Sequence, residues 1–421
     1  MSLTLLFLSV DSLKNRRLTA GLTIFAIALS VFLFLGVEKV RTEVKESFSN
    51  TISGTDLVVG ARSGSIQLLL YSVFRIGNAT SNVSWGSFQT ISQLKEVAWA
   101  IPLSLGDSHR GFRVLGTTAD YFKYYRYGKK QSLKLKNGRP FNDIFDAVLG
   151  AEVAEKLDYK LDQKIILSHG IGKITSAEHA DKPFQVSGIL AKTGTPLDRT
   201  IHISLKGMEA IHIDWRSGAP IPGFQISADE VKHLELRPKS ITAFLLGLNS
   251  KFKIFKVQRQ INQHDREPLL AILPGVALQE LWDLMSAAEM ALSAISILVI
   301  AVSLLVMIAM LFSSLNERRR EMAILRSVGA RASHIFFLLV LEAGFIAIIG
   351  ILIGIVISYL GLVIASPIIG SEFGLFLAVN FLTPREILIL FLVFASGLVT
   401  GAIPGYQAYK NSVADGMIVR L

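Results

Sequence analysis

Four uninterrupted apolar runs, each long enough to cross a bilayer as a helix, constrain this chain more than any other feature of its sequence. A hydrocarbon core about 30 Å thick needs about 20 apolar residues in a helix. The runs are Leu18–Val37, Met290–Leu315, Ile335–Ala365 and Ile387–Tyr409. None contains Lys, Arg or Asp, and the third contains one acidic residue, Glu342. The chain is therefore predicted to be an integral membrane protein.

The first apolar run is too long for a cleaved secretory signal. Such signals have an apolar core of about 7–15 residues and a small-residue cleavage site. Here the run has 20 residues, and the polar segment "VEKVRTEVK" begins at its end without an A-x-A-like site. We interpret this run as an uncleaved signal anchor.

The positions of Lys and Arg in the short loops predict the orientation, because positive residues resist translocation. Lys14, Arg16 and Arg17 precede the first run, whereas residues 366–386 contain one basic residue. The segment between the second and third runs contains Arg318, Arg319, Arg320, Arg326 and Arg331. Both termini and this arginine segment are therefore expected in the cytoplasm. The formal net charge of +10 follows partly from this topology, and no nucleic-acid partner is expected.

Residues 38–289 are expected outside the membrane, as a domain carried on two helical stalks. Apolar residues at helical spacing continue the helix of the first run, and a similar pattern leads into the second run. The first set is Val37, Val40, Val44, Phe48 and Ile52, and the second is Leu278, Leu281, Met285 and Ala288. Residues 1–37 then hold an N-terminal interfacial helix and the first span. Residues 290–421 hold the other three spans.

Between the stalks, the pattern is typical of a mixed α+β domain. The segment "DAVLGAEVAEKL" predicts a strand, a glycine turn and a helix. Short apolar and β-branched runs predict strands, and "KIFKVQRQIN" predicts a helix. The strand segments are "QKIILS", "PFQVSGIL", "TIHISL" and "SITAFLLGL". The predicted fold is a membrane protein with four transmembrane helices and a mixed α+β extracytoplasmic domain.

The sequence contains no recognisable catalytic centre. It has no cysteine, which excludes disulfides, thiolate metal sites and cysteine nucleophiles. The segment "GIGKIT" resembles the end of a phosphate loop, but Ile174 stands where Ser or Thr is required. Ser92 and Lys95 match an S-x-x-K pattern without its companion motifs. We expect a protein that is not an enzyme and binds no cofactor of its own.

Seven of the eight histidines lie in the predicted outer domain. His169, His179 and Asp181 fall in one segment, "HGIGKITSAEHAD", and imidazole with carboxylate suits zinc. However, no H-x₃-H or H-E-x-x-H spacing occurs. We therefore expect ordinary surface histidines and no metal centre, with binding by these three residues as the alternative.

Glu342 is the one charged residue inside the apolar runs. It lies about 10 Å into the third run at about 1.5 Å per residue. A carboxylate at that depth usually faces protein or water. We expect a structural hydrogen bond to a neighbouring helix, and a conformational or proton-linked switch is the alternative.

Small residues recur at helical spacing in the last two runs. They are Gly350, Gly354 and Ser358 in the third run and Gly397, Gly401 and Gly405 in the fourth. Such ladders let helix backbones approach closely. We expect these runs to pack on each other, and packing on a second protomer is the alternative.

The arginine segment has a helical pattern that orientation alone does not require. Glu317 and Glu321 alternate with arginines at helical spacing, and Gly329 is a candidate helix stop. Ser333 is a candidate N-cap for the third span. The pattern favours a short cytoplasmic helix that docks into a partner over a cluster that only fixes topology.

Two segments resemble a known family. "NERRREMAILRSVGARASHIFFLLVLEAGFIAIIGILIGIVIS" resembles the signature of FtsX-like permeases, and "DAVLGAEVAEKLDYKLDQKI" is similar to the periplasmic core domain of MacB-like permeases. The resemblance implies an ABC transporter permease of the type VII, mechanotransmission class. In that family the arginine segment, here within residues 316–334, is a coupling helix that contacts an ATPase. The matching positions are Glu317, Arg318, Glu321, Leu325, Arg326, Gly329 and Ala330.

The resemblance also implies a function and partners. The permease would couple ATP hydrolysis by a separate cytoplasmic ATPase to movement of the outer domain, exporting or extracting a peptide, lipid, lipoprotein or similar substrate. A second protomer in a homodimer and a periplasmic or lipoprotein partner are expected. The expected location is the bacterial inner membrane. Two alternatives stay open: a zinc-linked or other metal-linked ABC system, and a transmembrane regulator of an extracytoplasmic hydrolase.

Overall fold

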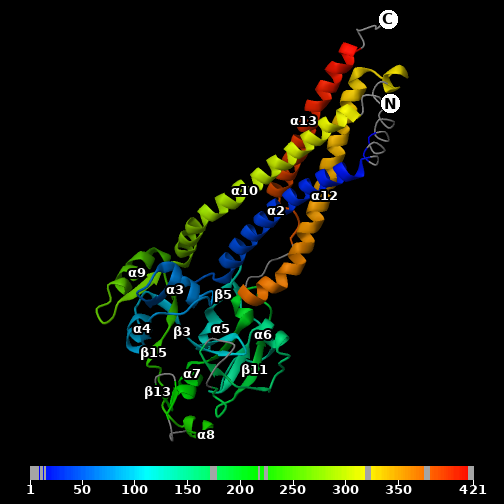
Figure 1. Cartoon of the computed structure of the whole chain (residues 1–421). Coiled ribbons are helices and arrows are strands. Elements are labelled where there is room, and N and C mark those ends of the chain that lie inside the picture. The colour runs from blue at the N-terminus through cyan, green and yellow to red at the C-terminus, as the bar shows by residue number, and fades with distance from the viewer. Residues whose placement is uncertain are drawn as a thin grey trace. The chain divides into compact units, whose positions relative to one another are not determined.

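The computed structural model describes residues 9, 13, 16–170, 178–216, 219–221, 226–317, 324–373 and 380–415 (Figure 1). The chain divides into two compact units. Unit 1 consists of residues 1–43, 286–369 and 377–421, and unit 2 consists of residues 44–285 and 370–376.

Among the described residues, four helices are long and apolar enough to cross a bilayer (Figure 1). They are α2 (Arg17–Thr51), α10 (Pro274–Glu317), α12 (Ala332–Phe373) and α13 (Pro384–Asp415). The four predicted spans are confirmed. Both predicted stalks are also confirmed, as unbroken continuations of α2 and α10, because neither helix contains proline beyond its first residue.

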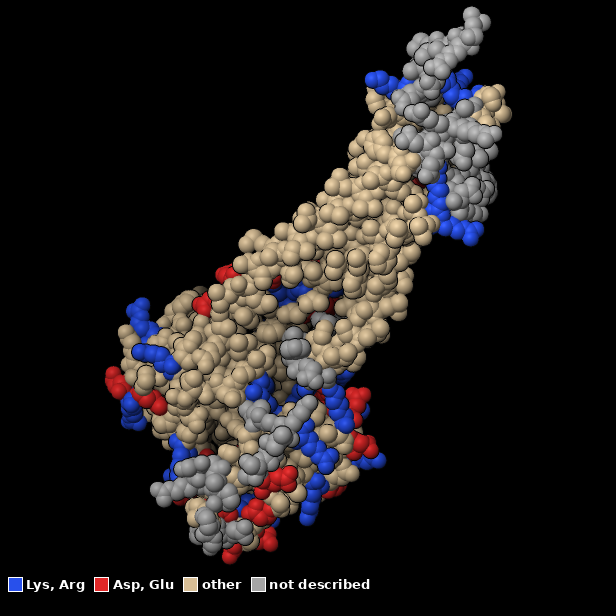
Figure 2. All heavy atoms as spheres, viewed as in Figure 1, with Lys and Arg blue, Asp and Glu red and all other residues tan. Residues whose placement is uncertain are grey.

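The surface of these helices has the composition that a lipid environment requires. Their outward-facing side chains are mostly Leu, Ile, Val and Phe. Figure 2 shows few charged side chains along the helices, with Lys and Arg gathered at one end. Arg17, at the start of α2, and Arg331, directly before α12, are both exposed. This is the distribution expected when cationic side chains mark the membrane boundary.

Glycines let α12 pack closely on α2. A Cβ atom on Gly354 would lie 2.8 Å from the carbonyl oxygen of Ala28 and 2.7 Å from the Cβ of Val31. A Cβ atom on Gly350 would lie 2.7 Å from the Cγ2 of Ile27. Since real Cβ atoms do not approach that closely, the glycine face of α12 lies directly against the backbone of α2.

The glycines of α13 lie on α12 in a similar way. A Cβ atom on Gly401 would overlap the Cβ of Ala343, and one on Gly397 would lie 3.0 Å from the Cβ of Ala347. The two ladders thus serve different helix pairs, α2 with α12 and α12 with α13, inside one chain.

A polar cluster joins α2 to the start of α13. The Lys39 side chain donates hydrogen bonds to the carbonyl oxygens of Asn380 and Phe381, at 3.0 and 3.1 Å. Its Nζ also lies 3.4 Å from Oε2 of Glu386. The side chains of Lys39 and Glu386 are 4% and 1% exposed, so this is a buried ion pair. The Asn380 amide donates to Glu43 at 3.0 Å and ties the same two segments together.

The first turn of α13 is closed by a capping box. The amide of Thr383 donates to the Glu386 carboxylate at 2.6 Å, and the amide of Glu386 donates to Oγ1 of Thr383 at 3.3 Å. Pro384 occupies the first helical position, where its missing N–H is no loss. Glu386 therefore has two roles, as helix cap and as partner of Lys39.

Unit 2 is a mixed α+β domain built on one large sheet. The strands of this sheet are β1 (Leu57–Ala61), β3 (Val97–His109), β4 (Phe112–Thr117), β7 (Leu135–Gly138), β8 (Asp146–Leu149), β9 (Lys164–Ile165), β10 (Ser168–His169), β11 (Phe184–Leu190), β12 (Thr200–Ser204), β16 (Ala243–Leu248) and β17 (Leu269–Ile272). Within the described residues the order is β17-β1-β16-β3-β4-β12-β8-β11-β7, with β10 paired to β3 and β9 paired to β11. The β4–β12 and β8–β11 pairs are parallel, and the other pairs are antiparallel.

Short helices and three small ribbons complete unit 2. The helices are α3 (Ser65–Ser72), α4 (Trp85–Ser92), α5 (Asp120–Tyr124), α6 (Ala151–Lys156), α7 (Leu205–His212), α8 (Ala228–Val231) and α9 (Ile254–Asn262), with 3-10 turns at Pro196–Arg199 and Lys251–Lys253. The ribbon strands are β2 (Val83–Ser84), β5 (Arg126–Tyr127), β6 (Gln131–Ser132), β13 (Trp215–Arg216), β14 (Ala219–Pro220) and β15 (Ser240–Ile241). Serine hydroxyls cap α4, α7 and α8, because a serine oxygen accepts the first free helix amides.

The strand, glycine turn and helix predicted for "DAVLGAEVAEKL" are confirmed as β8, Gly150 and α6. A Cβ atom on Gly150 would overlap the carbonyl oxygens of Leu197 and Asp198, so this turn accepts only glycine. The strands predicted for "PFQVSGIL" and "TIHISL" are confirmed as β11 and β12, and the predicted helix is confirmed as α9. The other two predictions are wrong in part, because "QKIILS" is divided between β9 and β10, and "SITAFLLGL" is divided between β15 and β16.

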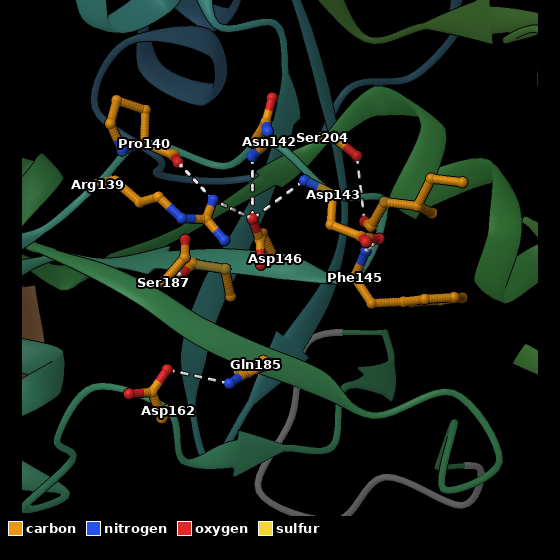
Figure 3. Close-up of polar contacts among 12 residues, drawn as sticks. Arg139, Pro140, Asn142, Asp143, Phe145, Asp146, Asp162, Gln185, Ser187 and Ser204 are labelled. Atoms are coloured by element: carbon orange, nitrogen blue, oxygen red, sulfur yellow. Dashed lines mark hydrogen bonds and ion pairs between the residues drawn. The ribbon is translucent and has the colours of Figure 1, made fainter.

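The loop before β8 is held by one buried carboxylate (Figure 3). Asp146 accepts hydrogen bonds from the amides of Asn142 and Asp143, at 2.9 and 3.0 Å, and from Arg139 at 2.5 Å. Burial alone would raise the pKa of Asp146, but these donors outweigh it and lower the pKa. The loop is therefore anchored by an ionised carboxylate. Because Asp146 is buried, water cannot take the place of its hydrogen-bond donors.

Candidate functional site

The predicted coupling segment is described in part. Arg318 and Glu321 lie outside the described residues, and Glu317 ends α10. Helical turns resume at residues 324–327 and end at Gly329, whose φ of 99° is left-handed. The amide of Gly329 donates to the carbonyl of Arg326, and that of Ala330 donates to the carbonyl of Leu325. This pair of bonds is a Schellman motif, and it confirms Gly329 as the helix stop.

The N-cap predicted for the third span is wrong by two residues. The helix α12 begins at Ala332, so Ser333 lies inside its first turn. The cap position is Arg331, whose amide donates to Nδ1 of His334 at 3.1 Å. His334 thus takes the part that Glu or Gln plays in a capping box.

Two apolar side chains of the coupling segment face solvent. Ile324 is 56% exposed and Val328 is 83% exposed. Since they are four residues apart in helical turns, they lie on the same face. Leu325 and Arg326 are only partly exposed. An exposed apolar pair on a loop is a surface suited to a protein partner.

Glu342 is buried within α12, with 3% of its surface exposed, and it has an interaction partner. It directly precedes Ala343, the residue over which Gly401 packs.

Four ionisable side chains of unit 2 converge on one point. They are Asp107, His169, His179 and His212, and one ligand-type atom of each lies within 4.8 Å of those of the others. Nδ1 of His169 lies 3.1 Å from Nε2 of His212 and 3.2 Å from Oδ1 of Asp107. Nε2 of His212 lies 3.5 Å from Oδ2 of Asp107.

The sheet positions Asp107 and His169. The register of β3 on β4 shifts between Leu105 and Ser108, so Asp107 sits at a β-bulge, a feature that commonly redirects side chains at functional sites. His169 is paired with Asp107 across the β10–β3 ladder. Directly opposed residues place their side chains on the same face, about 4.5–5.5 Å apart at Cβ.

Main-chain contacts hold the two other histidines. The amide of His179 donates to the carbonyl of Leu167 at 2.9 Å, which places His179 beside β10. His212 is the last residue of α7, and its Nδ1 lies 2.8 Å from the carbonyl oxygen of Met208. Because a carbonyl only accepts, Nδ1 of His212 carries a proton and Nε2 faces the cluster. The Trp215 ring packs on His179, with centroids 4.3 Å apart.

The charge states of His179 and Asp107 suit a cation. Burial lowers the pKa of His179 to about 4, so this imidazole is neutral at neutral pH. Burial alone would raise the pKa of Asp107, but the neighbouring His169 and His212 hold it at about 2, which keeps the carboxylate ionised. For His212, burial would lower the pKa, but the Asp107 carboxylate raises it.

Asp181, which belonged only to the alternative metal-binding set, is not part of this group. Its carboxylate instead binds the Lys182 ammonium at 2.5 Å. Lys182, whose side chain is fully buried, also binds Asp214 at 2.7 Å. This ion pair ties the segment after His179 to the segment after His212.

The expectation of ordinary surface histidines is wrong for His109, His179 and His202, which are 6%, 0% and 0% exposed. Sequence reasoning also missed Asp107 and His212 as members of the cluster. The four residues come from a bulged strand, a two-residue strand, a loop and a helix end, so no spacing motif joins them.

Comparison with known families covers most of the chain. The family model of the FtsX-like permease C-terminal domain matches residues 293–413. The family model of the MacB-like periplasmic core domain matches residues 18–243, more than half of the chain. The chain belongs to the family of MacB-like and FtsX-like ABC transporter permeases. As such a permease it is a multi-pass membrane protein with an extracytoplasmic MacB-like domain, and membership implies an ATPase partner. FtsX-like permeases are typically non-catalytic membrane subunits.

Two solved structures are similar to this permease. One is the periplasmic region of MacB from Actinobacillus actinomycetemcomitans, at 13% identity and a TM-score of 0.33, covering 55% of this chain and 94% of that one. The other is the extracellular domain of the noncanonic ABC-type transporter YknZ from Gram-positive bacteria, at 12% identity and a TM-score of 0.30, covering 52% of this chain and 99% of that one. No curated protein sequence matches the permease.

Proposed function

We propose that this permease is the membrane subunit of a mechanotransmission-type ABC transporter, driven by a separate cytoplasmic ATPase. The ATPase would hydrolyse ATP, and the permease would pass the resulting movement to its extracytoplasmic domain. The substrate class that fits is a peptide, lipid or lipoprotein exported or extracted on the outer side of a bacterial inner membrane. Two copies of the permease pair with the ATPase in this proposal.

The observation that carries the proposal is the exposed apolar pair on the coupling segment. Ile324 and Val328 present their side chains to solvent directly before the Schellman motif at Gly329. A loop that only fixed topology would need cationic residues but no ordered helix end and no apolar face. The ordered end and the apolar face are what a docking helix requires.

Continuous helices support the transmission step. No proline interrupts α2 between Arg17 and Thr51, and α10 is likewise unbroken after Pro274. Helices of 35 and 44 residues are about 50 and 65 Å long at about 1.5 Å per residue. Each therefore exceeds a hydrocarbon core of about 30 Å, so movement at one end is carried past the membrane.

The decisive experiment separates docking from topology. Ile324→Asp with Val328→Asp keeps every arginine, so the permease should insert normally. A buried unpaired charge at an interface costs about 2–5 kcal/mol, which is about 30- to several-thousand-fold in affinity. The ATPase that co-purifies from native membranes, identified by mass spectrometry, should be absent from this variant.

Phe252→Asp is the matched control, because Phe252 is a fully exposed apolar residue of the extracytoplasmic domain. It should retain the ATPase at the wild-type ratio. Wild-type recovery of the ATPase with the Ile324 and Val328 variant would refute docking through this surface.

A measurement of ATP hydrolysis gives a second check on the proposal. The permease purified alone should hydrolyse no ATP, because its sequence has no complete phosphate loop. Hydrolysis by a preparation proven free of any other polypeptide would contradict the assignment of ATP to a partner.

A further inference from the structure

The cluster of Asp107, His169, His179 and His212 belongs to the extracytoplasmic domain and contains no residue of the coupling segment, and the proposed function does not use it. We infer that these four side chains form a binding site for one divalent transition-metal ion of the zinc class. The inference is independent of the ATPase, because it rests only on the donor atoms of unit 2.

The spacing of the donor atoms matches a metal shell. Zinc binds imidazole nitrogen at about 2.0–2.1 Å in a tetrahedron, which places neighbouring donor atoms about 3.3–3.4 Å apart. Three separations here, among His169, His212 and Asp107, are 3.1, 3.2 and 3.5 Å. His179 supplies the fourth donor within 4.8 Å.

The buried members of the cluster have polar atoms without hydrogen bonds in the described part of the chain. His179 is fully buried, and within the described residues neither of its ring nitrogens has a hydrogen-bond partner. Both oxygens of Asp107, which is 1% exposed, likewise have no aligned hydrogen-bond donor in the described part of the chain. A buried imidazole without a hydrogen-bond partner is costly. Within the described residues, the Asp107 carboxylate is balanced by ion-pair contacts to His169 and His212, at 3.2 and 3.5 Å. A shared cation would satisfy both the His179 imidazole and this carboxylate.

The surroundings orient the ligands as metal sites usually do. Metal-binding histidines commonly donate their second ring N–H to a carbonyl or carboxylate, which fixes the tautomer. In His212 this bond is Nδ1–H to Met208, and it leaves the Nε2 lone pair toward the cluster. The Trp215 ring packs against both His179 and His169, with centroids 4.3 and 5.3 Å apart.

The cation has a route to the site. The side chains of His169 and His212 are 36% and 28% exposed, while Asp107 is closed to solvent. An ion would thus enter between the two open imidazoles and meet the carboxylate behind them. Four protein donors leave no open position, which is typical of a site that binds and holds an ion and does not catalyse.

The occupied site would join four elements of the domain. Strands β3 and β10 supply Asp107 and His169, the loop at residues 178–182 supplies His179, and α7 supplies His212. The ion would cross-link these elements. The Lys182–Asp214 ion pair already connects the loop to the segment after α7 and would hold both in place for binding.

The test measures zinc on the full-length permease in detergent micelles, carrying no polyhistidine tag. The protein is stripped with a chelator, dialysed against zinc chloride at neutral pH, and analysed by mass spectrometry for zinc per chain. The wild type should retain one equivalent. His169→Ala and Asp107→Asn should each bind more weakly by more than the roughly 10- to 100-fold that loss of an outer-shell partner causes.

His264→Asn is the matched control, because His264 is a partly exposed histidine of the same unit that contacts Ser87 and lies outside the cluster. It should retain one equivalent. Asp107 is buried and its variant could misfold, whereas His169 is partly open, so circular dichroism and gel filtration on His169→Ala decide whether its loss of zinc is specific.

Cobalt gives an independent readout. Cobalt(II) bound in place of zinc should show the strong visible absorption of a tetrahedral site in the wild type and not in His169→Ala. The inference is overturned if the wild type retains no zinc, or if folded His169→Ala and Asp107→Asn retain as much as the wild type. In that case the four side chains form a hydrogen-bonded cluster that needs no ion.

Discussion

The Lys39 ammonium nitrogen lies 3.4 Å from a carboxylate oxygen of Glu386, and both side chains are almost fully buried. One residue belongs to the first long helix and the other to the first turn of the last. A charge pair in such a position is held in place by the groups around it. Lys39 donates to two carbonyls just before α13, and Glu386 accepts the amide of Thr383.

The first prediction removes one member of this pair. Lys39→Met should destabilise unit 1 by about 3–5 kcal/mol, because it leaves the Glu386 carboxylate buried without its cation. The loss is measured by denaturant unfolding in micelles. Arg385→Met is the control: Arg385 pairs with Glu38 but is 60% exposed, so its loss should cost less than about 1 kcal/mol. An equal decrease in the free energy of unfolding for the two variants would show that the buried Lys39–Glu386 pair stabilises the fold no more than the exposed pair.

A second prediction concerns the glycine contact between α12 and α13. Gly401→Ala should destabilise unit 1 by about 1–3 kcal/mol, because the added methyl group overlaps Ala343 and forces the helices apart. Gly21→Ala is matched in chemistry, but no atom lies within 4 Å of its added Cβ. It should be neutral or slightly stabilising in the same unfolding assay. A Gly401→Ala variant as stable as Gly21→Ala would argue against close packing at this position.

The third prediction is a pH dependence carried by His202. Burial lowers the pKa of His202 to about 3, and the Arg75 guanidinium adds to this effect. Above the ordinary histidine pKa of 6.5, folded and unfolded chains are both neutral at this residue, and its contribution to stability is intact. As the pH falls below 6.5, the unfolded chain takes up a proton that the folded chain refuses. Stability should then fall by up to about 1.4 kcal/mol per pH unit until the pH approaches 3.

His202→Asn keeps a donor near the carbonyl of Val148 and removes the titrating ring. Thermal unfolding of this variant should depend less on pH between 6.5 and about 5 than that of the wild type. His233→Asn, at an exposed histidine, should follow the wild type. Identical slopes for the His202 variant and the wild type would mean that this imidazole does not resist protonation.

The fourth prediction tests the helix stop of the coupling segment. Gly329 has a φ of 99°, which an L residue adopts only with strain, so Gly329→Ala should cost about 1–2 kcal/mol locally. Among the described residues, no atom lies within 4 Å of a Cβ built on Gly329, so no clash there adds to this effect. We expect faster amide hydrogen exchange at Arg326 to Ala330 and weaker recovery of the ATPase. The control is Ser327→Ala, two residues before Gly329. It keeps the left-handed glycine and should leave both measurements unchanged.

Local sequence signals predicted most of the fold. The long helices were readable because apolar spacing continued past the membrane limit, from Leu18 to Phe48 in α2. The turn at Gly150 and the stop at Gly329 were readable because glycine has a narrow set of structural uses. The capping box of Thr383 and Glu386 was missed, although its T-x-x-E spacing and the proline at 384 are an available signal.

The candidate metal cluster could not be predicted in full from the sequence. His169 and His179 stood out because they share one short segment, and that segment also suggested Asp181. The choice between Asp181 and Asp107 depends on a β-bulge and on the Lys182 side chain, which captures Asp181. His212 reaches the cluster only because α7 ends beside it. These are properties of tertiary packing, and a residue spacing does not encode them.

The strands that enter and leave the extracytoplasmic domain are neighbours. The strand after α2 is β1, the strand before α10 is β17, and the two pair directly, with Val58 opposite Ile272. Because the pair is antiparallel, both helices attach at the same end of it. A pull that separates α2 from α10 would therefore open the ladder like a zip, from Val58 and Ile272 toward Ala61 and Leu269, one rung at a time. A ladder loaded in shear would share the force among all its rungs. We expect the β1–β17 pair to separate before the rest of the sheet when the domain is stretched. Single-molecule pulling through α2 and α10 would detect this separation as the first rupture.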